Sequence, residues 1–302
     1  MSPVLRGFAA LLFGLLLWGC AALPPPRGTG STRMVTCITR SLSGGTRLQV
    51  ISDRFEIADP SLILFLDAHP QLDGRILLSD LLFLERLVDT PCRALLFRPT
   101  EELREEVRKR LETSASDRPA GAPPADGISH GVLAGLDPVK LCKVSLMLDA
   151  LEDEVFLVSV SASIEADARD QSREHGGLVL VEGGDRCAAR LLEIPSASGG
   201  DHDFVLPPEL FTAGALAFWH NHAFDDLGLP LEELDNSGAM MPSGSLTGSL
   251  ATVWGDRWAG YIRGIDGLVF TPTGGSTFAV VYVTSDGVTI YLGKYKASRS
   301  PA

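Results

Sequence analysis

The chain has 302 residues, of which 45% are hydrophobic, and its formal net charge at pH 7 is −12. This composition allows a sizeable buried core in one or two domains and excludes a disordered chain. The acidic balance argues against nucleic-acid binding, which depends on Lys and Arg neutralising phosphates, and against a basic membrane-binding patch.

Residues 1–19 have the pattern of an export signal. Arg6 precedes the apolar stretch GFAALLFGLLLW, which is too short to cross a bilayer as a helix of roughly 20 residues. The next segment, LWGC, resembles the lipobox of bacterial lipoproteins, in which the Cys, here Cys20, is acylated (palmitate is one such acyl group) and becomes the N-terminus. A cleaved signal without acylation and an uncleaved anchor are the alternatives.

Residues 20–31 are rich in Pro and Gly and are expected to form a tether. Together with acylation, this tether predicts a protein that is lipid-anchored to a membrane of the bacterial cell envelope and faces the periplasm.

Four further cysteines form an even set: Cys37, Cys92, Cys142 and Cys187. An exported chain permits disulfides, so two bridges are expected, and the sequence does not choose among the three possible pairings. Pairing Cys37 with Cys92 and Cys142 with Cys187 would keep each bridge inside one predicted domain. The wide spacings argue against a zinc site made of cysteines.

Residues 32–113 are expected to form a smaller N-terminal α/β region, in which strand-like runs alternate with helices. The strand-like runs are 46–57 and 61–68. The segment 100–112 predicts a helix with a solvated charged face, because Leu103, Val107 and Leu111 recur every four residues. Residues 114–129, where Pro, Gly, Ala and Ser dominate, are expected to be a linker.

Residues 130–302 are expected to form an α+β domain, because helical patterns come first and strands follow. Asp137 as N-cap and Pro138 at the first helical position predict one helix, and 161–172 predicts a second. Short apolar runs predict strands at 176–182, 186–195, 214–222, 259–264, 267–272, 277–285 and 287–295.

The run GALAFWHNH ends in two histidines separated by one residue. Side chains of a strand alternate between faces, so His220 and His222 are expected on one side and Asn221 on the other. Two imidazoles on one side can bind one divalent ion, although such a pair can also be structural. Upstream, Glu174 stands where a helix gives way to a buried strand, a place from which a carboxylate can reach a cleft.

These residues resemble the motifs of the JAMM/MPN (JAB-like) metallopeptidases over about residues 150–295. In that family a Glu opens a strand in an E-x-x-G-x-L pattern, matched by Glu174 and Gly177 with Leu178 or Val179 in loose register. A central strand then ends in H-x-H, matched by His220 and His222. The resemblance implies a JAMM/MPN-like mixed sheet with flanking helices, a catalytic zinc ion, Glu174 as general base, and hydrolysis of peptide or isopeptide bonds.

The family's P-S-x-x-D segment is matched only in part by MPSGSLTGSLATVWGD at 241–256. The Pro and Ser are present, and the resemblance implies Ser243 or Ser245 as the hydroxyl that stabilises the oxyanion. The position of the Asp ligand falls on Ser249 or Leu246, neither of which is a good zinc ligand. An acid of the insertion at 223–238 is the possible substitute: Asp225, Asp226, Glu232, Glu233 or Asp235. Alternatively, that insertion is a solvated loop without any ligand.

The expected function is therefore a zinc-dependent peptidase-like or isopeptidase-like hydrolase of the cell envelope with an incomplete metal site, acting on a peptide or protein substrate. The alternative is a metal-free, inactive scaffold lipoprotein that binds an envelope protein. His175, next to Glu174, is expected to point to the other face and to lie at the surface.

Overall fold

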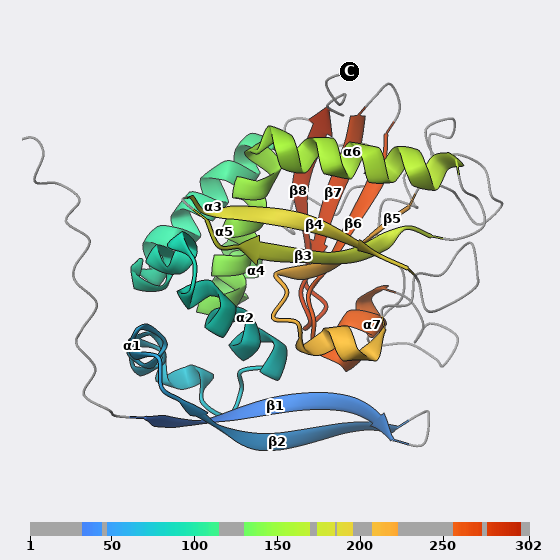
Figure 1. Ribbon diagram of the computed structural model, residues 1–302. Coiled ribbons are helices and arrows are strands. Elements are labelled where there is room, and N and C mark those ends of the chain that lie inside the picture. The colour runs from blue at the N-terminus through green and yellow to red at the C-terminus, as the bar shows by residue number, and fades with distance from the viewer. Residues whose placement is uncertain are drawn as a thin grey trace, which may run out of the picture. The chain divides into compact units, whose positions relative to one another are not determined.

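A six-stranded mixed sheet forms the centre of the fold in the computed structural model (Figure 1). The structure describes residues 32–43, 47–114, 130–169, 174–184, 186–195, 207–222, 256–273 and 277–296. The strand order is β4-β3-β5-β6-β7-β8. The strands are β3 (Gly176–Glu182), β4 (Ala188–Ile194), β5 (Ala217–Asn221), β6 (Gly267–Pro272), β7 (Thr277–Val283) and β8 (Thr289–Lys296).

Only β5 and β6 run parallel in this sheet, and every other neighbouring pair is antiparallel. The central strands are buried along nearly their whole length, which explains why they appear in the sequence as continuous apolar runs rather than as alternating patterns. The predicted α+β class with a mixed sheet and flanking helices is therefore confirmed.

Three helices cover one side of the sheet. They are α3 (Thr100–Ser114), α5 (Pro138–Glu152) and α6 (Glu154–Arg169). Figure 1 shows α6 lying across the strands, and it contacts β4, β5 and β6. The predicted start of α5 is confirmed, because the Asp137 side chain accepts a hydrogen bond from the Lys140 N–H and Pro138 occupies the first turn. The short helix α4 (His130–Gly135) precedes α5.

Residues 33–97 contain one antiparallel hairpin followed by helices, rather than the predicted alternation of strands and helices. The elements are β1 (Arg33–Ser43), β2 (Arg47–Ile57), α1 (Pro60–Ala68), η1 (Pro70–Leu72), α2 (Leu78–Val88) and η2 (Pro91–Phe97). The predicted strand at 61–68 is wrong: it is helix α1, because Asp59 caps the Leu62 N–H at 2.9 Å and Pro60 begins the first turn.

A second predicted strand, at 259–264, is also wrong. Residues 259–263 belong to α7 (Asp256–Arg263), and Gly264 directly follows the helix. Gly264 has a φ of 67°, a left-handed conformation that terminates helices and that glycine adopts without strain. A 3-10 turn, η5 (Pro208–Thr212), leads into β5.

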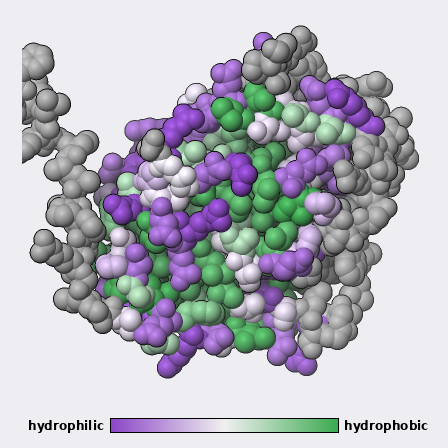
Figure 2. All heavy atoms as spheres, viewed as in Figure 1, coloured by the Kyte–Doolittle hydropathy of each residue, from purple (hydrophilic) through white to green (hydrophobic). Residues whose placement is uncertain are grey.

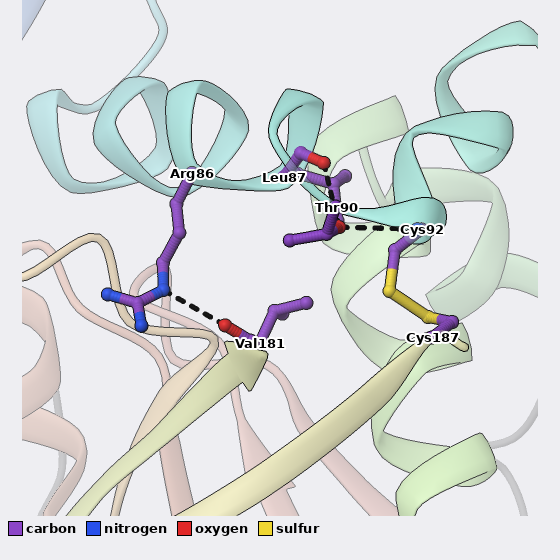
Figure 3. The surroundings of a disulfide bond; sticks show 6 residues. All are labelled: Arg86, Leu87, Thr90, Cys92, Val181 and Cys187. Carbon is purple, nitrogen blue, oxygen red and sulfur yellow. Dashed lines mark hydrogen bonds between the residues drawn. A yellow bond between two sulfur atoms is a disulfide. The ribbon is translucent and has the colours of Figure 1, made fainter. Parts of the chain in front are cut away.

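One disulfide joins Cys92 of η2 to Cys187 just before β4 (Figure 3). The pairing of Cys37 with Cys92 and of Cys142 with Cys187 is therefore wrong. Cys37 and Cys142 are free and buried, and burial raises the pKa of each thiol to about 12. Near the disulfide, the Thr90 hydroxyl accepts the Cys92 N–H at 3.2 Å. The bridge connects residues that are 95 positions apart in the sequence.

Side chains from before and after residues 115–129 share one hydrophobic core, which includes Leu84, Val107, Leu148 and Trp219. On the face drawn in Figure 2, hydrophobic residues gather in the middle and hydrophilic residues surround them. Arg86 strengthens the junction between α2 and the sheet, since its Nε donates to the Val181 carbonyl at 3.0 Å (Figure 3).

A buried cluster of charges lies between α2, α5 and the sheet. It consists of Asp80, Lys140, Lys143 and Asp266, whose side chains are 0–3% exposed. Lys143 Nζ lies 2.6 Å from Asp80 and 3.1 Å from Asp266, and Lys140 Nζ lies 2.7 Å from Asp266. Two ammonium groups thus face two carboxylates, so the cluster is neutral overall.

Further polar groups surround Asp266. The Tyr282 hydroxyl donates to it at 2.8 Å, and the Ser285 N–H donates at 2.7 Å. Burial opposes ionisation, yet Lys140 and Lys143 hold the pKa of Asp266 well below its usual range. Burial likewise opposes the charge of Lys140, yet Asp266 and Asp80 raise its pKa above the usual range. Asp266 and Lys140 are therefore charged in the folded protein at neutral pH.

Lys143→Met is expected to lower the free energy of unfolding by about 3–5 kcal/mol, because it leaves an uncompensated carboxylate in the interior. The double variant Lys143→Met/Asp80→Asn restores neutrality and should recover at least a third of that loss in urea unfolding. Lys109→Met, which removes only the exposed pair with Glu105, is the matched control and should change stability by less than about 0.5 kcal/mol. Strictly additive losses in the double variant would contradict this account of the cluster.

Cys92→Ser/Cys187→Ser is expected to lose about 2–5 kcal/mol of stability, since the bridge closes a long loop in the unfolded chain. Reductant should lower the unmutated protein to the same stability and leave the variant unchanged.

Iodoacetamide should modify Cys37 and Cys142 only in denaturant, because both thiols are buried and their pKa values are raised. Rapid labelling of either thiol in the folded protein would show that this part of the core opens.

Candidate functional site

The end of β5 is held from both sides. The Asn221 N–H donates to the His175 carbonyl at 3.0 Å, and the His222 N–H donates to the Phe270 carbonyl at 2.8 Å. The Asn221 amide also donates to the Ser163 hydroxyl of α6 at 2.9 Å. Neighbouring strands and α6 therefore fix the backbone at the point where the two histidines emerge.

His220 and His222 project to one side of the strand, while Asn221 points to α6, as the alternation of side chains predicts. The Nε2 atoms of the two imidazoles are 3.0 Å apart, and the ring centroids are 4.9 Å apart. At this spacing one ring can donate a hydrogen bond to the other. Both nitrogens can equally reach one divalent ion, because zinc–imidazole bonds are about 2.0–2.1 Å long.

Glu174 lies across from this pair by strand register. In the antiparallel pairing of β3 with β5, Gly176 is opposite His220. Continuing the same register by two residues brings Glu174 opposite His222, and the hydrogen bond between Asn221 and His175 supports this continuation. Directly opposed residues share a face of the sheet, so Glu174 is on the side of the two imidazoles.

His175 lies on the other face, as predicted, but the expectation that it is a surface residue is wrong. Its side chain is 6% exposed, and its Nδ1 lies 2.6 Å from a carboxylate oxygen of Glu193. Glu193 is opposite Gly177 in the pairing of β3 with β4, which places it beside His175 on the same face. A side chain of the neighbouring strand β4 therefore contacts His175.

Asp167 is a residue of this neighbourhood that the motifs do not include. It lies near the end of α6, and its Oδ1 accepts the His175 N–H at 3.0 Å. Its other oxygen, Oδ2, is buried without a hydrogen-bond partner among the described residues. Burial and the nearby Glu174 carboxylate raise the pKa of Asp167 to about 7, while the His175 N–H, His220 and His222 lower it. Asp167, Glu174 and the two imidazoles thus share one electrostatic environment.

The sequence does contain a signal for Asp167. Phe156, Val160, Ser163 and Asp167 recur at intervals of four, three and four residues and form the buried stripe of α6. A carboxylate on the apolar stripe of a helix is costly to bury and therefore indicates a specific role.

Two imidazoles and nearby carboxylates are a suitable donor set for zinc, but a third donor is not in place among the described residues. Within those ranges no three His, Cys, Asp or Glu side chains lie close enough together to hold a metal ion. Several predicted site residues lie outside the described residues: Cys20, Asp225, Asp226, Glu232, Glu233, Asp235, Ser243, Ser245, Leu246 and Ser249. The structure therefore brings the two predicted histidine ligands together, and strand register alone places Glu174 opposite His222.

Comparisons with known protein families, with curated proteins and with solved structures found no match. Among the helices that the structure describes, none is long and apolar enough to cross a membrane.

Gly177 is required by the close approach of β4. A Cβ atom at this position would overlap the carbonyl oxygen of Leu192. Gly177 is also opposite Trp219 in β5. A larger side chain at Gly177 would therefore disturb the packing of β3 between β4 and β5. Its place two residues after His175 makes it part of the framework that positions Glu174.

Gly177→Ala is expected to destabilise the protein by about 1–3 kcal/mol, because β4 must shift to accept the methyl group. Gly184→Ala is the matched control, since a Cβ atom there would meet only open space. Urea unfolding of both variants measures the difference. Equal stabilities of the two variants would show that β4 does not press on β3 as described.

Proposed function

We propose that this protein is a zinc-dependent hydrolase of peptide or isopeptide bonds with a JAMM/MPN-like C-terminal domain. The observation that carries the proposal is the 3.0 Å separation of the His220 and His222 Nε2 atoms at the end of a central strand, with Glu174 opposite in register. Backbone hydrogen bonds on both sides hold the two histidines in place, so the pair is pre-organised to bind a ligand.

His220 and His222 would hold the metal in this proposal. A bound zinc ion supplies Lewis acidity and lowers the pKa of a bound water to about 7. Glu174 would take the proton from the attacking water as general base, and its place across from His222 suits that role. Ser243 or Ser245 would donate a hydrogen bond to the oxyanion of the substrate.

The third ligand in this proposal is Asp225 or Asp226 of the 223–238 insertion, which follows His222 directly in the sequence. Asp167 would not bind the metal itself. Its buried carboxylate, in contact with the His175 N–H, would position the start of β3 and add negative charge near the imidazoles.

We also propose that Cys20 anchors the protein by acylation to a membrane of the cell envelope, where it faces the periplasm. The disulfide between Cys92 and Cys187 supports an oxidising compartment. A cell-wall peptide or a secreted protein is the substrate class that such a location favours.

A metal-free scaffold that binds an envelope protein is the second candidate function. Two observations favour it: the described residues offer no third ligand, and the segment that resembles P-S-x-x-D has Ser249 or Leu246 at the ligand position. In that case the two imidazoles form a hydrogen-bonded pair, with one ring donating to the other.

Zinc content of the dialysed full-length protein, measured by mass spectrometry, separates the two candidates. One zinc ion per chain is expected, with affinity at least about 100-fold lower in His222→Ala and in Asp225→Ala/Asp226→Ala, since even outer-shell changes cost 10–100-fold. His69→Gln is the matched control, because that imidazole bonds Phe65 and Thr100 and takes no part in the proposed site.

Glu174→Gln should still bind zinc but hydrolyse labelled casein or purified peptidoglycan about 10²–10⁴-fold more slowly. An unmutated protein that binds no zinc rules out the peptidase and leaves the scaffold. A zinc-bound Glu174→Gln variant with full activity would exclude the role assigned to Glu174.

A further inference from the structure

A cavity of about 480 Å³ lies between β1, α2, η5 and α7. Its walls are Ile38–Ser41, Leu77–Ser79, Phe211–Thr212 and Ile262–Gly264. This volume is in the range of small-molecule sites, which combine mostly apolar walls with a few polar groups. The lining here is also mostly apolar with a few polar groups, because it combines Ile, Leu and Phe side chains with two arginines and small hydroxyl residues.

This cavity is at the opposite end of the sheet from the histidine pair. In the parallel pairing of β5 with β6, Phe218 is opposite Gly267 and Asn221 is opposite Phe270. His222 follows the last residues of β5, whereas Arg263 and Gly264 precede the first residue of β6. The cavity is therefore a second location, separate from the proposed metal site.

The two arginines of the cavity differ in their surroundings. Arg40 is satisfied: its guanidinium bonds the Asp286 carboxylate at 2.9 Å and the carbonyls of Ser285 and Tyr261 at 3.0 and 3.2 Å. Arg263 is partly buried, and its guanidinium lies 5.0 Å from the ring centroid of Phe211. Among the described residues, no carboxylate lies within ion-pair distance of Arg263 and no acceptor bonds it.

An unpaired guanidinium in a partly buried position is unfavourable by itself. Burial lowers the pKa of Arg263, and none of the acids that the structure describes raises it again. Two nearby acids of the described residues pair with other groups: Asp80 of α2 faces Lys140 and Lys143, and Asp286 faces Arg40. The five N–H donors of an arginine match the two oxygens of a carboxylate or phosphate. An anionic ligand would therefore accept the hydrogen bonds that the Arg263 guanidinium does not make to the described residues.

We propose that this cavity binds a small amphipathic carboxylate, with its charged group on Arg263 and its apolar body against Leu77, Leu78 and Ile262. The guanidinium lies over the Phe211 ring, and its planar set of N–H donors favours a two-oxygen acceptor over a single point charge. The first turn of α2, whose N-cap Leu77 offers no side-chain cap, adds to the positive potential there. This binding does not depend on the proposed hydrolase function.

Calorimetric titration of the full-length protein with octanoate, 1-octanol and inorganic phosphate tests the proposal. Octanoate is expected to bind, with 1-octanol and phosphate each at least about tenfold weaker. Arg263→Gln should weaken octanoate binding at least about tenfold, while Arg263→Lys keeps part of it. Arg169→Gln, which removes an exposed arginine paired with Glu165, is the matched control and should bind octanoate like the unmutated protein.

Thermal unfolding shows whether loss of octanoate binding in Arg263→Gln results from misfolding. Arg263→Gln should be at least as stable as the unmutated protein without ligand, and octanoate should raise the Tm of the unmutated protein only. Treatment with a metal chelator should leave octanoate binding unchanged, so failure of the zinc proposal and failure of this one are distinguishable. Equal octanoate affinity in Arg263→Gln and the unmutated protein would overturn the assignment, as would phosphate binding as tightly as octanoate.

Discussion

The buried pairing of two lysines with two aspartates is the interaction on which the arrangement of this protein depends. It connects α2, α5 and the approach to β6, which are distant in sequence, and none of the four charges can be left without the others in a dry interior. Hydrophobic contacts alone tolerate small displacements, whereas ion pairs of 2.6–3.1 Å do not. The cluster therefore selects one register for these elements.

Both candidate sites are attached to this cluster. The carbonyl of Asp266 accepts the Phe218 N–H at 2.9 Å, which aligns β5 with β6 and so places His220 and His222 at the far end of the strand. On the other side, Ser285 bonds Lys140 through its hydroxyl and Arg40 through its carbonyl. A displacement of the cluster would thus shift both the histidine pair and the wall of the cavity.

The strands of the sheet could be predicted because their apolar runs are short and bounded by Gly, Asp and Pro. The run at 61–68 misled the prediction, since a short, mostly apolar segment does not distinguish a buried strand from a buried helix. The preceding Asp59 and Pro60 form the same start signal that correctly indicated the helix after Asp137. The short run at 259–264 was also predicted as a strand, although residues 259–263 form the end of helix α7 and Gly264 follows it.

The positions of the site residues along one strand could be predicted from the sequence, whereas their contacts with other elements could not. Alternation along one strand suffices to place His220, His222 and Asn221, and the register with β3 then adds Glu174. The burial of His175 could not be foreseen, because it depends on β4 bringing Glu193 alongside. The same holds for the disulfide, whose partners are set by how η2 meets β4 rather than by cysteine spacing.

The bridge between Cys92 and Cys187 also has a consequence for proteolytic cleavage of the chain. Hydrolysis of any one peptide bond between these two cysteines yields two polypeptides that stay covalently attached, because the sulfur–sulfur bond spans the cut. Core side chains come from both polypeptides, so the bridge keeps the two halves of the core on one molecule. The two fragments therefore separate only when the disulfide is also reduced.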